Sequence, residues 1–256
     1  MLFYLQDKNI RFIFALNLKT NIMNKIKGYV IYEGKSEING GNIVAIVTLN
    51  SKNIKTGDMA SMWILNADLP PTKASQLGLD ESVCGDCVHR HFSNGSCYVT
   101  LFQAPLQVYK AWEKGNYPMV TDMSIFKDMS IRFGAYGDPY ALPIDILTSI
   151  KSYVKNNTSY THQWQQGIDA LKKISMASVD SIIEAKVAQK NGWRTFRVTN
   201  DINTLMDSEI ICPNTTHGIK CIDCKLCSGY SKAKSIVILT HGAKSKKFIE
   251  VLEEAI

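Results

Sequence analysis

The sequence predicts an α/β fold, in the form of a single (β/α) partial-barrel-like domain with two cysteine-rich metal-binding loops. Strand-like and helix-like segments alternate from residue 130 onward, which is typical of a mostly parallel sheet with helices outside it. Polar residues recur directly after the strand-like segments, and seven cysteines fall into two tight groups. Six or seven strands of this kind suit a barrel, complete or partial, better than a small flavodoxin-like sheet.

The first part of the chain is less regular. Residues 43–49 form an apolar run rich in β-branched side chains, which indicates a buried strand, and residues 62–65 indicate another. Pro70-Pro71 then stops regular structure. Residues 101–114 have apolar side chains at helical spacing, and a glycine follows them, so we expect a helix there.

The repeating part begins at residue 130. The strands expected in it are residues 130–136, 159–164, 174–177, 193–198, 208–211 and 235–240. The helices expected between and after them are one opened by Pro143, one that runs from an N-cap at Ser178 to Gln189, and a closing helix over residues 244–255.

Composition excludes several classes of protein. With 45% hydrophobic and 20% charged residues the chain is an ordinary globular one rather than a disordered one. No apolar run reaches the roughly 18 residues of a membrane-spanning helix. The net charge of +6 allows contact with nucleic acid, and it fits a simple basic surface equally well.

The N-terminal stretch is predicted to lie outside the fold. Arg11 interrupts its apolar run and no small-x-small site follows, so a signal peptide is not expected. Residues 23–27 look like an ordinary translation start. We therefore expect residues 1–22 to be an extension and residues 23–256 to form one α/β metal-binding domain, with a strand or helix docked on the domain as the alternative for residues 1–22.

The first cysteine group is Cys84-x2-Cys87-x9-Cys97. A secreted disulfide scaffold would be shorter and would carry an even number of cysteines, so these thiols indicate a metal site in a reducing compartment. His89 or His91 could complete a Cys3His zinc site. Alternatively, three thiolates could hold a 4Fe-4S iron-sulfur cluster and leave one iron open to a small molecule.

The second cysteine group closes the sequence. It comprises Cys212, followed by proline, and the triple Cys221-x2-Cys224-x2-Cys227. Three thiolates on one short loop and a fourth at a distance suit a tetrahedral zinc ion or a 4Fe-4S cluster. The triple run is more typical of iron-sulfur loops, and zinc remains the alternative.

Polar residues at the strand ends are the candidates for the rest of the site, because ligands bind at this edge of α/β sheets. We predict catalytic roles for Asp138, His162 and His241. Cofactor-binding roles are predicted for Tyr136, Gln163, Ser178 and Thr199. The simpler interpretation is that such residues are N-caps and turn formers, which for Ser178 and Asp201 is the favoured one.

The order of these features resembles radical S-adenosylmethionine enzymes, in which a three-cysteine loop follows the first barrel strand and a further cluster lies near the C-terminus. The resemblance is architectural. The loop here is Cys-x2-Cys-x9-Cys rather than Cys-x3-Cys-x2-Cys, and no Gly-Gly-Glu segment is present. The resemblance implies S-adenosylmethionine as a candidate cofactor.

Specific strings resemble the phage "gene product 88" proteins over about residues 42–242. They include residues 55–59 (KTGDM), 84–87 (CGDC), 96–99 (SCYV), 136–139 (YGDP), 160–164 (YTHQW), 176–178 (MAS) and 193–198 (WRTFRV). The resemblance implies a bacteriophage or mobile-element origin and a cytoplasmic location in the bacterial host. It supplies no activity.

Two functions follow as expectations. The first is an iron-sulfur enzyme, with the Cys84 group reactive, the Cys212 group auxiliary or structural, and an unknown small molecule or nucleic acid as substrate. The second is a zinc-binding, non-catalytic protein that binds nucleic acid or a host protein. Neither expectation includes a membrane, and no phosphate-loop, serine-hydrolase or His-Glu-x2-His motif points elsewhere.

Overall fold

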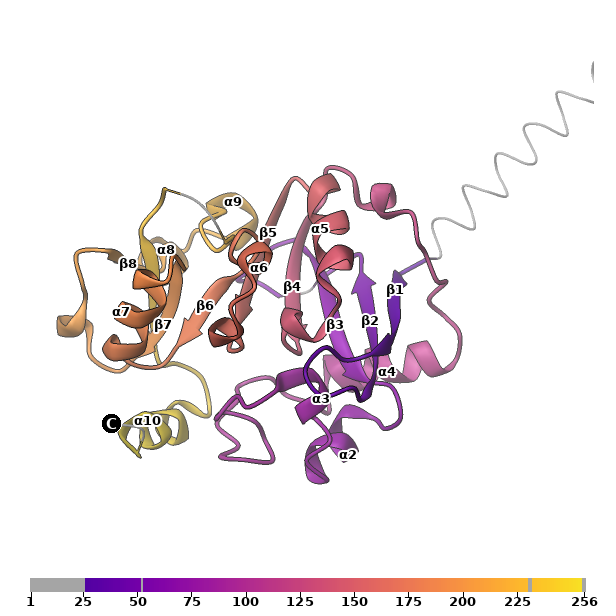
Figure 1. Cartoon of the computed structure of the whole chain (residues 1–256), viewed down its shortest axis with the longest axis horizontal. Helices are drawn as coiled ribbons and strands as arrows, with labels where there is room; N and C mark the ends of the chain where they lie inside the picture. Colours follow the sequence, from indigo (N-terminus) through magenta and orange to yellow (C-terminus); the bar gives the residue numbers. More distant parts are fainter. Residues whose placement is uncertain (1–25, 52, 230–231, 255–256) are drawn as a thin grey trace, which may run out of the picture.

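The computed structural model describes residues 26–51, 53–229 and 232–254. The predictions for residues 1–22 lie outside the described residues. The described chain forms one nine-stranded sheet with helices packed against it (Figure 1).

The sheet is mostly parallel, as predicted. Its strands are β1 (Gly28–Lys35), β2 (Asn42–Thr48), β3 (Ala60–Asn66), β4 (Ser130–Tyr136), β5 (Asn156–Thr161), β6 (Met176–Val179), β7 (Thr195–Thr199), β8 (Glu209–Ile211) and β9 (Ser235–Leu239). Their order is β1-β2-β3-β4-β5-β6-β7-β9-β8. The β1–β2 and β2–β3 pairs are antiparallel, and every later pair is parallel.

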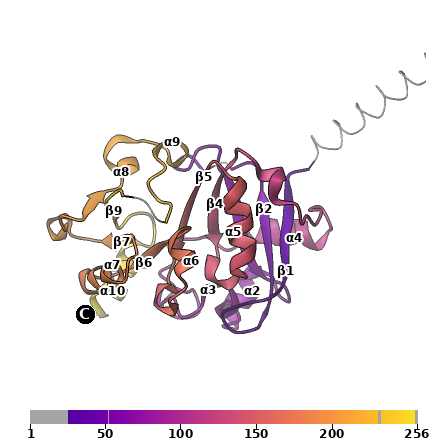
Figure 2. The ribbon, with the colours of Figure 1, turned by 45° about the horizontal axis from the view of Figure 1, so that its top comes forward.

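The helices pack on both faces of this sheet. They are α2 (Pro71–Gln76), α3 (Glu81–Cys84), α4 (Ala104–Glu113), α5 (Ile144–Tyr153), α6 (Asp169–Lys172), α7 (Ile182–Lys190), α8 (Pro213–His217), α9 (Cys221–Cys224) and α10 (Ser245–Glu254). Helices α5 and α6 lie on one face, and α4 lies on the other (Figures 1 and 2). Because both faces are covered, residues 43–47 of β2 are all buried.

The core explains why the apolar runs form these elements. The buried positions of α5 are Leu147 and Ile150, which pack against the sheet, and Ile144 and Ile146 are partly buried beside them. On the opposite face Val108 and Tyr109 of α4 join the same cluster. Full burial of such a side chain contributes about 1.5–3 kcal/mol to folding.

Several sequence predictions differ from the structure. Strand β1 was not expected, since its apolar residues do not alternate strictly and a register shift between Val30 and Tyr32 interrupts its pairing with β2. The short helices α2, α3 and α6 carry too few apolar positions to show a period. The N-cap prediction for Ser178 is wrong, because Ser178 lies inside β6. Helix α7 is capped instead by Ser181, whose hydroxyl accepts a hydrogen bond from the Glu184 N–H at 3.1 Å.

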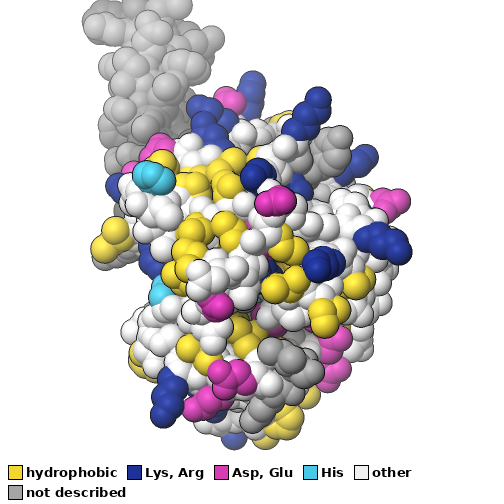
Figure 3. Space-filling model, turned by 90° about the vertical axis from the view of Figure 1, so that its left-hand side faces the viewer, with side chains coloured by type: hydrophobic (Ala, Val, Ile, Leu, Met, Phe, Trp, Pro, Cys, Tyr) yellow, Lys and Arg dark blue, Asp and Glu magenta, His cyan; other side chains and the backbone are white. Residues whose placement is uncertain are grey.

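The surface on the α7 and β8 side is mixed. Apolar side chains gather in the middle of this face, and charged side chains lie around them (Figure 3). No helix among the described residues is long and apolar enough to cross a bilayer.

Candidate functional site

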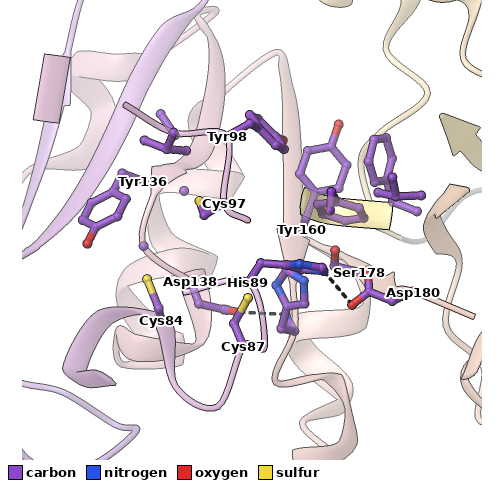
Figure 4. A pocket seen from close by; sticks show the side chains of 18 of the residues that line it. Cys84, Cys87, His89, Cys97, Tyr98, Tyr136, Asp138, Tyr160, Ser178 and Asp180 are labelled. Carbon is purple, nitrogen blue, oxygen red and sulfur yellow. Dashed lines mark hydrogen bonds and ion pairs between the residues drawn. The ribbon is translucent and has the colours of Figure 1, made fainter. Parts of the chain in front are cut away.

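A cavity of about 140 Å³ brings the first cysteine group to the ends of the parallel strands. Cys84, Cys87 and Cys97 line it on one side, and their sulfur atoms surround a shared space (Figure 4). Residues at the ends of β4, β5 and β6 line the other side. This is the edge of a parallel sheet at which ligands bind.

The backbone between α3 and β4 holds the three thiols in place. Helix α3 ends at Cys84, and Gly85 turns the chain with a φ of +60°, a conformation that favours glycine. A Cβ at position 85 would lie 2.4 Å from Nε2 of Gln163. The Cys97 N–H donates to the carbonyl oxygen of His89 at 2.8 Å, which closes the loop.

His89 anchors this loop to the sheet. Its buried ring bonds through Nδ1 to the Ser96 hydroxyl at 2.7 Å and through Nε2 to Oδ2 of Asp180 at 3.0 Å. The ring also stacks on Phe248 of α10, with centroids 3.9 Å apart. Both ring nitrogens are therefore engaged.

His91, the other histidine considered as a zinc ligand, is also engaged. Its Nε2 bonds to the carbonyl oxygen of Val99 at 2.9 Å, and its Nδ1 lies 3.1 Å from Nζ of Lys244. Burial lowers the pKa of His91, which favours the neutral ring and an Nδ1 that accepts from Lys244.

Asp138 fixes the backbone that follows β4 and β5. Its Oδ1 accepts the Tyr140 N–H at 2.9 Å, and its Oδ2 accepts the His162 N–H at 2.7 Å. Burial raises the pKa of this carboxyl group. Asp138 therefore fixes the backbone that carries His162.

The His162 side chain faces the cysteine loop. Burial lowers its pKa, but contact with Cys87 and the nearby carboxylates outweighs this effect and raises the pKa to about 10. Tyr136 makes a corresponding hydrogen-bonding contact with Cys84. Thiolate ligands of metal centres accept hydrogen bonds of this kind.

Asp180 is an unexpected member of the site. One ligand atom each from His89, His162 and Asp180 lies within 4.8 Å of the others, a grouping able to hold a cation. Oδ1 of Asp180 is buried in the cavity wall and has no hydrogen-bond partner among the described residues. A buried acceptor of this kind is costly unless a ligand or water donates to it.

The structure brings together most of the predicted site. Tyr136, Asp138, His162 and Ser178 all line the cavity. Gln163 lies beside it, and its Nε2 donates to Oδ1 of Asp86 at 2.6 Å.

Two predicted residues lie elsewhere. The Thr199 hydroxyl donates to the carbonyl oxygen of Asp201 at 3.2 Å, in the turn that Asp201 caps, so Asp201 is a turn former as predicted. His241 is exposed and outside the cavity lining. The prediction missed Asp180, and it considered His89 only as a possible zinc ligand, not as the anchor of the cysteine loop. Asp180 directly follows β6. Because the strand was expected to end at residue 177, Asp180 was not recognised as a strand-end residue.

The second cysteine group lies at the other end of the sheet, where Figure 1 shows α9 opposite α3. The Cys212 N–H continues the sheet pairing by donating to Val237 O at 2.8 Å. The Cys221 N–H donates to the carbonyl oxygen of Lys55, in the β2–β3 loop, at 3.0 Å. Burial raises the pKa of Cys227 to about 12.

Tyr160 lies between the two groups. Its ring lines the cavity of the first group, and its hydroxyl is close enough to Cys227 of the second for each group to shift the pKa of the other. The ring packs against Phe196, with centroids 4.3 Å apart. Tyr160 therefore connects the two cysteine groups, as does Arg132, which lines the cavity and acts on Cys221.

The cysteine groups do not form a ready-made zinc site. In a tetrahedral zinc site with Zn–S distances near 2.3 Å, the sulfur atoms lie about 3.8 Å apart. Among the described residues no cysteine sulfur belongs to a set of three ligand atoms within 4.8 Å.

The chain matches no protein-family model, no curated protein and no solved structure. The functional argument therefore rests on the geometry of the site.

Proposed function

We propose that this protein is an iron-sulfur enzyme of a phage or mobile element, acting in the cytoplasm of the bacterial host. The Cys84, Cys87 and Cys97 group forms the reactive site. The Cys212, Cys221, Cys224 and Cys227 group is auxiliary or structural. The observation that carries the proposal is that the three thiols line one cavity with the polar ends of β4, β5 and β6.

The topology supports this proposal. Strands β3-β4-β5-β6-β7-β9 form a run of six neighbouring parallel strands, and the three-cysteine loop follows β3, the first of them. Radical S-adenosylmethionine enzymes place their three-cysteine loop after the first strand of a partial barrel. We propose the same partial-barrel arrangement here, with the two cysteine-rich loops as its metal-binding segments.

The residues fit a 4Fe-4S cluster. Three thiols face a shared space, and the side chains of Tyr136 and His162 lie beside two of the sulfurs. Cys84, Cys87 and Cys97 would hold the cluster, and with three protein ligands it would leave one iron open to a small molecule, for which S-adenosylmethionine is the candidate.

The chain's own residues shape the rest of the cavity. Asp138 holds His162 beside Cys87, and the free Oδ1 of Asp180 accepts a hydrogen bond from a bound molecule. Phe248 covers His89 and closes the α10 side of the cavity. These groups orient a ligand and exclude water from it.

The test is metal and sulfide analysis with visible spectroscopy on protein purified without oxygen. We expect about eight irons per chain, with acid-labile sulfide, and about four after Cys84, Cys87 and Cys97 are all changed to serine. The matched control replaces Cys221, Cys224 and Cys227, and it should retain about four irons at the first site. S-adenosylmethionine cleavage is then measured on the loaded protein.

One outcome of the metal analysis would contradict the proposal. Zinc in a colourless protein would overturn the enzyme proposal and favour the alternative, a zinc protein that binds nucleic acid or a host partner. Nucleic-acid binding would then weaken steeply with salt.

A further inference from the structure

A second, larger cleft adjoins the cysteine cavity. Its volume is about 800 Å³, within the range of roughly 300–1,000 Å³ typical of small-molecule sites. It lies between the β2–β3 loop, β3 and the start of α4, on the face of the sheet that α4 covers. Tyr98, Val99, Arg132 and Ala135 line both spaces, so the cleft and the cavity share a wall.

The charged side chains that line the cleft, among the described residues, are all positive. Arg132 and Lys27 line it, and no aspartate or glutamate among the described residues does. The ion pairs of the described chain also leave Arg132 without a carboxylate partner. A half-buried guanidinium without a partner is suited to bind an anion, and bidentate contact with phosphate is its usual use.

The start of α4 adds to this positive field. Its first residues, Ala104 and Pro105, line the cleft next to the N-cap residue Gln103. Within the described part of the chain no side chain caps this helix end, and the first turn of the helix contains no acidic residue. The helix dipole therefore also favours negative charge in the cleft.

The remaining lining is aromatic and polar. Trp63, Tyr98 and Tyr117 supply ring faces. Amide groups are contributed by Asn50, Asn53, Gln103 and Gln107. Aromatic rings stack on planar groups, and amides exchange hydrogen bonds with the edges of such groups.

We infer that the cleft binds a nucleoside phosphate, with the phosphate held by Arg132. This inference deepens the proposed function, because it names the substrate class that the cysteine cavity would act on. The nucleotide is either free or part of a single strand of nucleic acid. The shared wall at Arg132 and Tyr98 directs the bound molecule toward the three thiols.

The experiment is equilibrium dialysis of the full chain, purified without oxygen, against the nucleoside monophosphates and the matching nucleosides. Iron is measured in the same samples. We expect the monophosphates to bind at least tenfold more tightly than the nucleosides. Equal binding of both, or binding of neither, would overturn the inference.

Single substitutions distinguish binding in the cleft from a general effect of positive surface charge. Arg132→Gln should weaken monophosphate binding at least tenfold, and Lys27→Gln, on the other part of the lining, should weaken it less. Lys186→Gln on α7, an exposed lysine outside the cleft, removes the same charge and should leave binding unchanged. If Lys186→Gln weakened binding as much as Arg132→Gln, the site assignment would fail.

The two proposals can fail separately. Because the charge of Arg132 also acts on Cys221, iron content is compared between Arg132→Gln and the parent protein. Monophosphate binding by a protein that lacks iron would overturn the iron-sulfur proposal and support the cleft assignment. Competition by a short single-stranded oligonucleotide would identify the polymer as the source of the nucleotide, and its absence would identify the free nucleotide.

Discussion

His89 and Asp180 are 91 residues apart in the sequence and are joined by a contact of 3.0 Å between Nε2 and Oδ2. The contact fastens the three-cysteine loop to the end of β6. It uses the ring nitrogen that a zinc ligand would need, so His89 acts here as an anchor of the loop. The position of the thiols depends on this anchor as much as on their spacing in the sequence.

Replacing His89 should therefore loosen the first cysteine group. We expect His89→Ala to lower the free energy of unfolding by about 1–3 kcal/mol, because Oδ2 of the half-buried Asp180 loses its partner. Metal bound by the first group should fall while the second group keeps its metal. Thermal melting and metal analysis measure the two effects.

His241→Ala is the matched control, since that histidine is exposed and outside the cavity. It should melt like the parent protein. An unchanged melting temperature and full metal content in His89→Ala would show that the anchor is dispensable.

Tyr160 offers a test of the link between the two cysteine groups. Tyr160→Phe keeps the ring against Phe196 and removes the hydroxyl that lies close to Cys227 and lowers its pKa. We expect both metal sites to remain filled, with a change in the spectrum and reduction potential of the second site only, because hydrogen bonds to sulfur tune such centres. A variant indistinguishable from the parent in both readouts would contradict the link.

The buried ion pair between Arg197 and Glu209 should support the second group. Its two bonds, Nε–Oε1 at 2.8 Å and Nη2–Oε2 at 2.7 Å, join β7 to β8, the strand that leads into Cys212. Glu209→Gln leaves a buried guanidinium without its counter-charge, so we expect a loss of about 3–5 kcal/mol in unfolding free energy. Urea unfolding measures the loss.

The exposed pair of Asp169 and Lys172 supplies the comparison. Asp169→Asn should leave stability almost unchanged, because exposed ion pairs contribute little. If Glu209→Gln and Asp169→Asn lowered the unfolding free energy equally, burial would not explain the contribution of the Arg197 ion pair to stability.

Metal removal should expose the thiols to alkylation. In the loaded protein we expect iodoacetamide to modify few cysteines, and after chelation without oxygen we expect all seven to react. Cys227 should be the slowest, since it is buried and burial raises its pKa to about 12. Mass spectrometry after timed quenching measures the order. Identical labelling before and after chelation would argue against bound metal at these thiols.

Much of the fold could be predicted from the sequence. Strand β4 has the predicted bounds of residues 130–136, and α5 begins one residue after Pro143. These elements carry strong apolar patterns that tertiary contacts reinforce. Strand β1 has no such pattern, and its pairing with β2 becomes evident only in three dimensions.

The site could be predicted only in part. The residue types and the spacing of the thiols and of the strand-end residues indicate a site already in the sequence. The role of His89 depends on Ser96, Asp180 and Phe248, and that of Arg132 depends on a cleft built from several separate segments. Contacts between distant segments leave no local period in the chain.

The hydrogen bond from the Cys221 N–H to the carbonyl oxygen of Lys55 has a consequence for synthesis of the protein. The β2–β3 loop leaves the ribosome before the segment from Cys212 to Cys227, because the chain is made from its N-terminus at about 5–20 residues per second. The later cysteines therefore dock on a loop that was synthesised earlier. The second site can be completed only after Cys227 has been translated, so any delivery of metal to that site must follow the synthesis of strands β1 to β8.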